Sequence, residues 1–207
     1  HNGCREGFSP IQDIEKQQIQ DEFAAGQPYF FYTGAIHPRK NIPRLIRAFD
    51  LFKNKTAAPV KLLLAGRFAW ETGEVKSTHE QANSRTDIHF LGYIADEKLP
   101  KLMASALALT YVSLSEGFGL PVLEAMHTDT PVLVSDTTSL PEVAGEAGLL
   151  VDPLSESAIA AGLEKLWNDR AFAQNLVEKG RLQRKKFSWD TAAGQVWEVL
   201  RNVAAKR

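Results

Sequence analysis

The stretch PYFFYTGAIHPRKNIPRLIRAFDLF, residues 28–52, contains one complete strand, loop and helix. Its aromatic-rich run Tyr29–Thr33 predicts a buried strand, which Gly34 closes. Beyond the loop, apolar residues from Leu45 to Phe52 recur at the spacing of one helical face. The stretch therefore predicts a strand that is followed by an amphipathic helix.

The same alternation continues toward the C-terminus. Short apolar runs predict further strands at residues 60–65, 88–91, 107–112 and 131–134. Between them we expect a helix within residues 71–85, a helix with Asp96 as its N-cap, and a helix that begins at residues 120–126. From residue 153 onward the pattern is helical to the end. Strands that alternate with helices in this way predict an α/β protein with a doubly wound parallel sheet.

Residues 1–28 do not fit the alternation. Their polar opening, with two glycines and a proline in the first ten residues, predicts a linker, and residues 11–23 predict a short helix. We expect residues 29–207 to form one domain, which is large enough to bury a substantial core.

The composition argues against several classes of function. A formal net charge of −1 over 207 residues gives no basic field, so no binding to nucleic acid is expected. Cys4 is the single cysteine, which excludes an internal disulfide and fits a reducing compartment. The five histidines lack paired metal-ligand spacing, so no metal site is expected. The apolar runs are too short to span a membrane.

The sharpest functional signal is the run EGFGLPVLE, residues 116–124. Its glycines let the backbone approach a ligand closely, and Pro121 suits the first turn of a helix. The free amides and the positive dipole end of that helix suit an anionic group. Glu124 leans back toward this helix end, where its two oxygens suit the hydroxyls of a ribose. Glu116 then faces a second polyol or polar group.

Other interpretations of this pair of acids stay open. Two carboxylates also serve glycoside hydrolases, one as acid and one as nucleophile. Amide donors suited to phosphate argue against that chemistry, because a simple hydrolase does not need them. In the plainest interpretation Glu124 caps a surface helix and Glu116 is solvated, which the whole nine-residue arrangement disfavours.

Two further loops carry cations. The loop GAIHPRKN, residues 34–41, lacks a full G-x-G-x-x-G pattern, so a dehydrogenase cofactor is not indicated. It offers Arg39 and Lys40 beside a helix start, with Asn41 as the expected N-cap, and two cations there would counter a diphosphate. Arg67, after the next strand, would add a contact to a phosphate or a sugar.

These loops, in this order, resemble the C-terminal domain of retaining GT-B glycosyltransferases of family 4. The resemblance extends from about Tyr29 to Trp197. It rests on GAIHPRKN, FLGYIADEKL (90–99), SEGFGLPVLEAM (115–126), TPVLVSD (130–136) and SLPEVAGEAGLLVDP (139–153). The resemblance implies a Rossmann-like fold that is the C-terminal half of a GT-B enzyme, with the N-terminal acceptor domain absent from this chain.

The resemblance also implies roles for individual residues. Glu124 would bind the donor ribose, Glu116 would be the catalytic residue that contacts the transferred sugar, and Lys40 would bind the diphosphate. Backbone amides would come from Gly117, Phe118, Gly119 and Leu120. The donor-binding set further contains Gly34, Arg39, Arg67, Gly92, Tyr93 and Ile94, of which residues 92–94 would border the base. No metal or other cofactor is implied.

The chain departs from the family pattern at two points. Ala35 stands where many members have an arginine, and Arg39 or Arg67 would have to compensate. Asp129 stands where a glycine is common, and aspartate is among the few residues that tolerate a positive φ there. His127, nearby, is expected to be a packing or surface residue.

The resulting expectation is a hexosyltransferase that acts with retention on a nucleotide-sugar donor, GDP-mannose or a UDP-hexose. The acceptor would be a glycan or a lipid-linked glycan, bound by the absent domain, so this chain alone would transfer sugar poorly. A noncatalytic nucleotide-binding module and a glycoside hydrolase or phosphorylase remain as alternatives. We expect a cytoplasmic protein, with peripheral association of the longer protein at the inner face of the membrane. Exposed apolar surface is expected on the helix that carries Trp189 and Trp197.

Overall fold

The computed structural model describes residues 2–70 and 72–204. His1, which was counted among the histidines, lies outside the described residues. So do Glu71, at the start of one expected helical stretch, and the last three residues of the expected domain.

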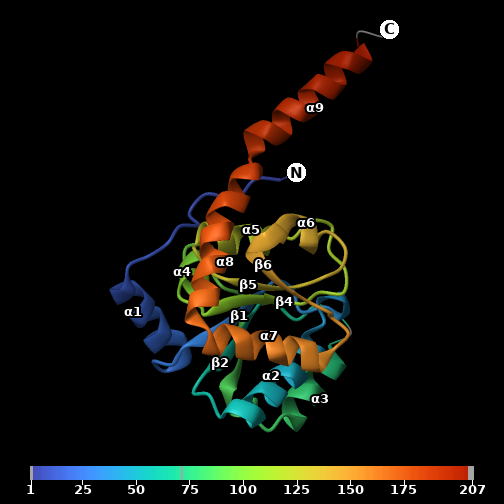
Figure 1. Ribbon diagram of the computed structural model, residues 1–207. Coiled ribbons are helices and arrows are strands. Elements are labelled where there is room, and N and C mark those ends of the chain that lie inside the picture. The colour runs from blue at the N-terminus through green and yellow to red at the C-terminus, as the bar shows by residue number, and fades with distance from the viewer. Residues whose placement is uncertain (1, 71, 205–207) are drawn as a thin grey trace.

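A six-stranded sheet forms the centre of the molecule (Figure 1). The strands are β1 (Tyr29–Thr33), β2 (Lys61–Ala65), β3 (Ile88–Gly92), β4 (Ala108–Tyr111), β5 (Val132–Ser135) and β6 (Gly148–Val151). Their order is β3-β2-β1-β4-β5-β6, and every neighbouring pair is parallel. The doubly wound α/β fold is therefore confirmed. Strand β6 was not predicted, because it is short and only partly buried.

The central strands explain why the apolar runs were readable. Every residue of β1, β2, β4 and β5 is buried, as is usual where helices cover both faces of a parallel sheet. In β1, the rings of Tyr29 and Phe31 meet edge to face, and Phe30 packs in the same way on Phe52. The sequence 28–52 thus forms the strand and the amphipathic helix that it predicts.

Helices cover both faces of the sheet (Figure 1). They are α1 (Asp13–Ala24), α2 (Ile42–Thr56), α3 (Gly73–Gln81), α4 (Leu99–Ala104), α5 (Leu120–His127), α6 (Leu140–Ala144), α7 (Glu156–Asn168), α8 (Arg170–Gln183) and α9 (Trp189–Ala204). Short 3-10 turns are η1 (Pro38–Lys40), η2 (Arg85–Asp87), η3 (Gly145–Ala147) and η4 (Arg184–Lys186). Helix α2 contacts α3 and α7 on one face, whereas α5 contacts α4, α6 and α8 on the other.

One of the two expected caps is wrong. Asp96 does not cap α4, because the helix begins at Leu99 and residues 95–98 form a turn before it. Asn41 is the N-cap residue of α2, as expected, but its side chain makes no capping hydrogen bond. Its side-chain Nδ2 instead donates to the carbonyls of Val112 (2.9 Å) and Pro153 (2.7 Å). Asn41 thus connects its own loop to the loops that contain Val112 and Pro153.

Asp129 adopts the positive φ that the sequence suggested, at 56°. Its carboxylate also accepts hydrogen bonds from Arg181, at 2.7 Å and 3.1 Å, which the sequence did not indicate. His127 lies at the end of α5, where burial and the charge of Arg184 lower its pKa.

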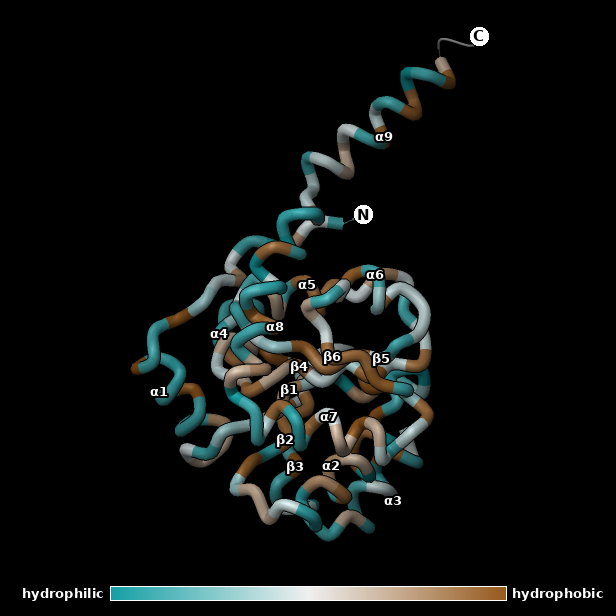
Figure 2. The backbone as a smooth tube through the Cα atoms, in the orientation of Figure 1, coloured by the Kyte–Doolittle hydropathy of each residue, from teal (hydrophilic) through white to brown (hydrophobic). Residues whose placement is uncertain are grey.

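The two ends of the chain differ in how they pack. In the N-terminal segment, Phe8, Ile19 and Ala24 are buried, and α1 contacts α4. Helix α9 projects away from the body (Figure 1), and none of its described residues is buried. Brown apolar positions recur along it in Figure 2, and Trp197 is 66% exposed. The expected exposed apolar surface is therefore present.

Over the described residues, no helix combines the length and the apolar character that a membrane crossing requires.

Candidate functional site

The sheet order changes direction between β1 and β4, and the carboxyl edge at that point is where an open α/β sheet has its binding crevice. The chain proceeds from β1 to β2 on one side and from β4 to β5 on the other, so the two following loops diverge. Ligands of open α/β sheets bind at such a switch point. The loop of residues 34–41 and the loop of residues 112–119 flank this crevice, and both contain predicted binding residues.

Glu116 joins the two loops. Its Oε1 accepts a hydrogen bond from Lys40 Nζ at 2.5 Å, and its Oε2 accepts one from Arg39 Nη1 at 2.9 Å. The side chains of Lys40 and Glu116 are each 7% exposed, whereas that of Arg39 is 48% exposed. Three residues that the sequence selected separately therefore form one charged cluster.

Tyr111 holds Lys40 in place, and Tyr32 packs behind it. Lys40 Nζ donates to the hydroxyl of Tyr111 and lies 4.7 Å from the centre of that ring. Tyr32 stacks on Tyr111, with ring centres 6.0 Å apart. Sequence reasoning missed both tyrosines, and the signal was that each lies near the end of a strand whose following loop carries charge.

The cluster shifts the ionisation of its members. Burial opposes the charge on Glu116, but the hydrogen bonds from Lys40 and Arg39 outweigh it and lower the pKa of the carboxyl group. Burial lowers the pKa of Lys40, and Glu116 opposes that shift. Glu116 is therefore a carboxylate at neutral pH, suited to accept hydrogen bonds rather than to donate a proton.

The loop after Glu116 leads directly into α5. Gly119 has φ of 108°, and an added Cβ would lie 2.7 Å from Leu140 Cδ2, so the turn requires glycine. The hydroxyl of Ser139 donates to the carbonyls of Glu116 (2.9 Å) and Phe118 (3.0 Å). The predicted residues Gly117 and Phe118 thus belong to a loop that Ser139 braces, and Leu120 begins α5. The ring of Phe118 packs edge-on against Phe187.

Glu124 is buried in α5 and has a partner that the sequence did not predict. Its side chain is 4% exposed, and its Oε1 accepts a hydrogen bond from Arg5 Nε at 2.9 Å. Arg5 also forms an ion pair with Asp96 at 3.4 Å. Burial raises the pKa of Glu124, and Arg5 opposes this shift. Arg5 lies in a segment interpreted as a linker, and nothing in its sequence pattern signals this contact.

A pocket of about 430 Å³ opens beside the crevice, where the loops after β1, β2 and β3 meet. Its lining contains Gly34, Arg67, Tyr93, Ile94 and Asp96. The guanidinium of Arg67 lies 4.8 Å from the centre of the Tyr93 ring.

Glycines allow the loops after β1, β2 and β3 to approach one another closely. A Cβ on Gly66 would lie 1.8 Å from the carbonyl oxygen of Gly34, so only glycine fits there. Gly66 N also donates to the carbonyl of Gly92 at 2.7 Å. The structure thus brings together the second group of predicted residues, Gly34, Arg67, Gly92, Tyr93 and Ile94.

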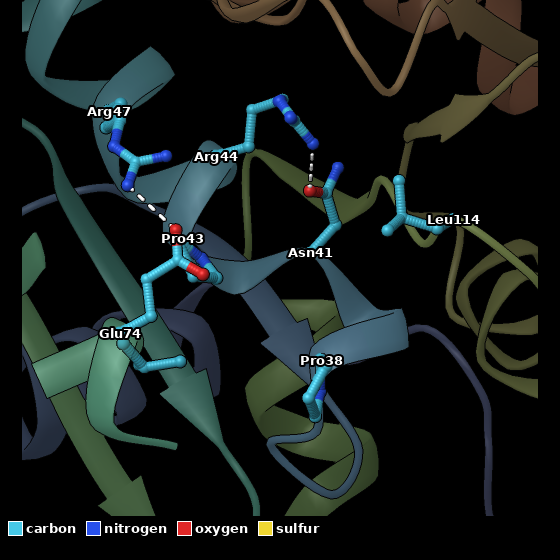
Figure 3. A pocket seen from close by; sticks show the side chains of 8 residues that line it. Pro38, Asn41, Pro43, Arg44, Arg47, Glu74 and Leu114 are labelled. Carbon is cyan, nitrogen blue, oxygen red and sulfur yellow. Dashed lines mark hydrogen bonds and ion pairs between the residues drawn. The ribbon is translucent and has the colours of Figure 1, made fainter. Parts of the chain in front are cut away.

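Figure 3 shows a different pocket, of about 270 Å³, on the far side of Asn41. Its two arginines already have protein partners. Arg44 Nη1 donates to Asn41 Oδ1 at 2.7 Å, and Arg47 Nη2 donates to Glu74 Oε1 at 2.9 Å. These contacts brace the start of α2 beside the crevice.

Within the described ranges, no group of three or more histidine, cysteine, aspartate or glutamate side chains is arranged to hold a metal ion.

The family model described as "Glycosyl transferases group 1" matches residues 13–183. An O-antigen chain mannosyltransferase B from Escherichia coli is 37% identical over 193 residues. The alignment covers 93% of this chain and 51% of that relative, so the chain spans about half of its length.

Two solved structures share the fold. The C-terminal domain of a glycosyl transferase group 1 family protein from Francisella tularensis superposes with a TM-score of 0.75 at 25% identity. That match covers 87% of this chain and 95% of that domain. HepE from Anabaena, in complex with UDP-glucose, superposes with a TM-score of 0.86 at 21% identity, over 98% of this chain and 56% of that one.

Proposed function

This chain belongs to the group 1 glycosyl transferases, as a C-terminal domain of that family, and from this premise we propose that it is the donor-binding half of a hexosyltransferase. The donor is a nucleotide sugar, and the complete enzyme transfers its hexose to a glycan or a lipid-linked glycan with retention at the anomeric carbon.

The observation that carries this proposal is that the loop after β1 contributes both to the paired-cation cluster at the switch point, through Arg39 and Lys40, and to the neighbouring pocket, through Gly34. In the proposal, the diphosphate of the donor lies near Lys40 and Arg39, in front of the first amides of α5. The nucleoside extends into the pocket beside Gly34 and Ile94, with its ribose at Glu124. Cations and helix amides, rather than a metal ion, then face the diphosphate.

The chemistry follows from charge that is fixed before the reaction. As the bond between sugar and diphosphate breaks, negative charge grows on the leaving diphosphate, and cations already held in place stabilise it without rearrangement. Lys40 is suited to this because Glu116 and Tyr111 fix its position. Glu116, as a carboxylate, accepts hydrogen bonds from hydroxyls of the transferred sugar.

We favour GDP-mannose as the donor because the 37% identical relative is a mannosyltransferase. A UDP-hexose is the alternative, because HepE has been solved with UDP-glucose. A relative that extends O-antigen chains makes a lipid-linked glycan the favoured acceptor. We therefore propose that the longer protein works in the cytoplasm, at the inner face of the membrane where such an acceptor lies.

Calorimetric titration of the chain with GDP, UDP and ADP tests the donor site. We expect one nucleotide to bind with millimolar or tighter affinity, and Glu124→Ala to weaken it by about tenfold or more, because hydrogen bonds to a charged group are lost. Glu80→Ala, an exposed change on α3, is the matched control and should leave binding unchanged. Binding of none of the three nucleotides, or equal binding to the Glu124→Ala chain, would contradict the proposal.

A second measurement addresses the half of the relative's length that this chain does not span. This chain alone should transfer hexose far more slowly than a protein that carries both halves, when both are given the same donor and glycan. Equal rates would show that the chain needs no further domain.

A further inference from the structure

We propose that residues 3–8 form a lid over the donor site, in which the Arg5 side chain takes the place of the donor ribose at Glu124. This inference rests on the proposed function and adds a donor-free closed state to it. The lid must open before a nucleotide sugar binds.

The exposure of Glu124 requires such a movement. A ribose can bind this carboxylate only by touching its oxygens, yet the side chain is 4% exposed. Arg5 Nε occupies one of those oxygens at 2.9 Å, and Arg5 Nη1 reaches Asp96 at 3.4 Å. Asp96 lines the pocket proposed for the nucleoside. Arg5 therefore connects two carboxylates on the nucleoside side of the site.

The lid is anchored on both sides of Arg5. Phe8 is buried, and the Arg5 guanidinium lies 5.3 Å from the centre of its ring. On the other side, Trp189 Nε1 donates to the carbonyl of Cys4 at 3.2 Å. Gly3 packs so closely on Trp189 that an added Cβ would lie 2.6 Å from its backbone nitrogen. The segment is thus held at its ends, whereas its centre depends on Arg5.

Arg5 is suited to a reversible contact. A buried carboxylate without a partner is costly, so Glu124 needs either a cation or the hydroxyls of a ligand. Arg5 supplies the cation, and because its side chain is 47% exposed it can turn into solvent without opening the core. Ribose hydroxyls then replace it. The apparent affinity for the donor is then the affinity of the open state multiplied by the fraction of chains in which the lid is open.

The lid also connects the donor site to α9. Trp189 is the first residue of that helix, and the opening segment of the chain lies beside it (Figure 1). A displacement of α9 would therefore pull on Cys4, next to Arg5.

Calorimetry on Arg5→Ala tests the lid. If Arg5 competes with the ribose, the variant should bind its nucleotide about threefold more tightly than the unaltered chain, the gain expected when a half-exposed ion pair no longer competes. Arg170→Ala is the matched control, because Arg170 is exposed at the opposite edge of the sheet, and it should bind as the unaltered chain does. Equal or weaker binding by Arg5→Ala would overturn the lid.

Trypsin gives a second test on the unaltered chain. The protease must draw the whole Arg5 side chain into its own specificity pocket, so cleavage after Arg5 reports only chains in which Arg5 has left Glu124. Saturating nucleotide should accelerate this cleavage several-fold, followed by mass spectrometry of the fragment that begins at Glu6. An unchanged or slower rate would overturn the lid.

Calorimetry distinguishes a wrong lid from a wrong donor site. If the unaltered chain and Arg5→Ala bind a nucleotide with equal affinity, the lid is wrong and the donor site stands. If neither chain binds any nucleotide, the proposed function is wrong, and the lid is wrong with it.

Discussion

The surroundings of Glu116 and Glu124 differ, although the two residues lie close together in sequence. Glu116 is in the loop before α5, and Glu124 is in α5 itself. Their side chains are similarly buried, at 7% and 4% exposed. Two cations from the adjacent loop hold Glu116, and one of them, Lys40, is itself buried. The partner that the described residues give Glu124 is Arg5, which is half exposed and comes from the far N-terminal segment. The pKa of Glu116 is lowered, whereas that of Glu124 is raised.

This difference separates a permanent part of the site from an exchangeable one. Lys40 is itself buried, so its separation from Glu116 would leave buried charge unpaired. That pair is therefore fixed before any ligand arrives. Arg5 can leave Glu124 because solvent already reaches it. Four substitution experiments would break or sharpen this contrast.

The largest effect is expected from Lys40→Met. Lys40 is the buried partner of Glu116, and its removal should cost about 3 kcal/mol of stability, the low end for a broken buried ion pair, because Arg39 still pairs with Glu116. Urea unfolding at pH 7 measures the loss. Lys98→Met is the control, because Lys98 pairs with Glu22 at the surface, where such pairs contribute less than about 1 kcal/mol.

The double variant Lys40→Met with Glu116→Gln identifies the cause. Because it removes both charges, it should regain much of the stability that Lys40→Met loses. A double variant as unstable as Lys40→Met would mean that lost packing, and not unpaired charge, explains the effect.

A smaller loss, about 1–3 kcal/mol, is expected from Gly119→Ala. The substitution forces a side chain into the positive-φ turn between the two glutamates and against Leu140. Gly117→Ala is the control, because an added Cβ there meets nothing within 4 Å. If the two variants are equally stable in urea, the turn does not constrain the loop as described.

The two glutamates should affect the pH dependence of stability in opposite directions. The native pKa of Glu116 lies below its ordinary value of 4.5, so Glu116 stabilises the fold above pH 4.5, and this is lost as the pH falls through the native pKa. The native pKa of Glu124 lies above 4.5, so its stabilising effect is present below pH 4.5 and is lost as the pH rises.

Urea midpoints of Glu116→Gln and Glu124→Gln between pH 3.5 and 7 would measure these contributions. Relative to the unaltered chain, Glu116→Gln should lose stability as the pH rises, and Glu124→Gln should gain it. If the stability of both variants, relative to the unaltered chain, changed in the same direction as the pH rises, the two glutamates would not differ as described.

The smallest effect on stability is expected from Arg5→Ala, at less than about 1 kcal/mol in urea at pH 7, because the ion pair is half exposed. A loss as large as that of Lys40→Met would mean that Arg5 belongs to the fixed part of the site.

Most of the fold was readable from the sequence because the deciding strands are buried on both faces. Their apolar runs are nearly continuous, and Gly34 after β1, Gly66 after β2 and Gly92 as the last residue of β3 mark where these strands end. Elements with weaker patterns were missed. Strand β6 is half exposed, and α6 has five residues, too few for a helical period to stand out.

The site divides in the same way. Glu116, Glu124, Lys40 and the strand-ending glycines were predicted because each lies in a short motif with a local physical meaning. The roles proposed for them stay predictions. Asp96 was assigned to a helix cap, whereas it forms an ion pair with Arg5, because a local pattern cannot show which distant side chain lies nearby.

The sequence by itself determined the alternation of strands and helices, the turns that need glycine, and the loops that carry charge, because these depend on neighbours within a few residues. Only the tertiary structure decided which charges are paired. The pairing of Lys40 with Glu116 follows from the positions of β1 and β4 in the sheet, and that of Arg5 with Glu124 from the return of the N-terminal segment. An ion pair needs a separation of about 3 Å, and chain folding sets that distance between residues far apart in sequence.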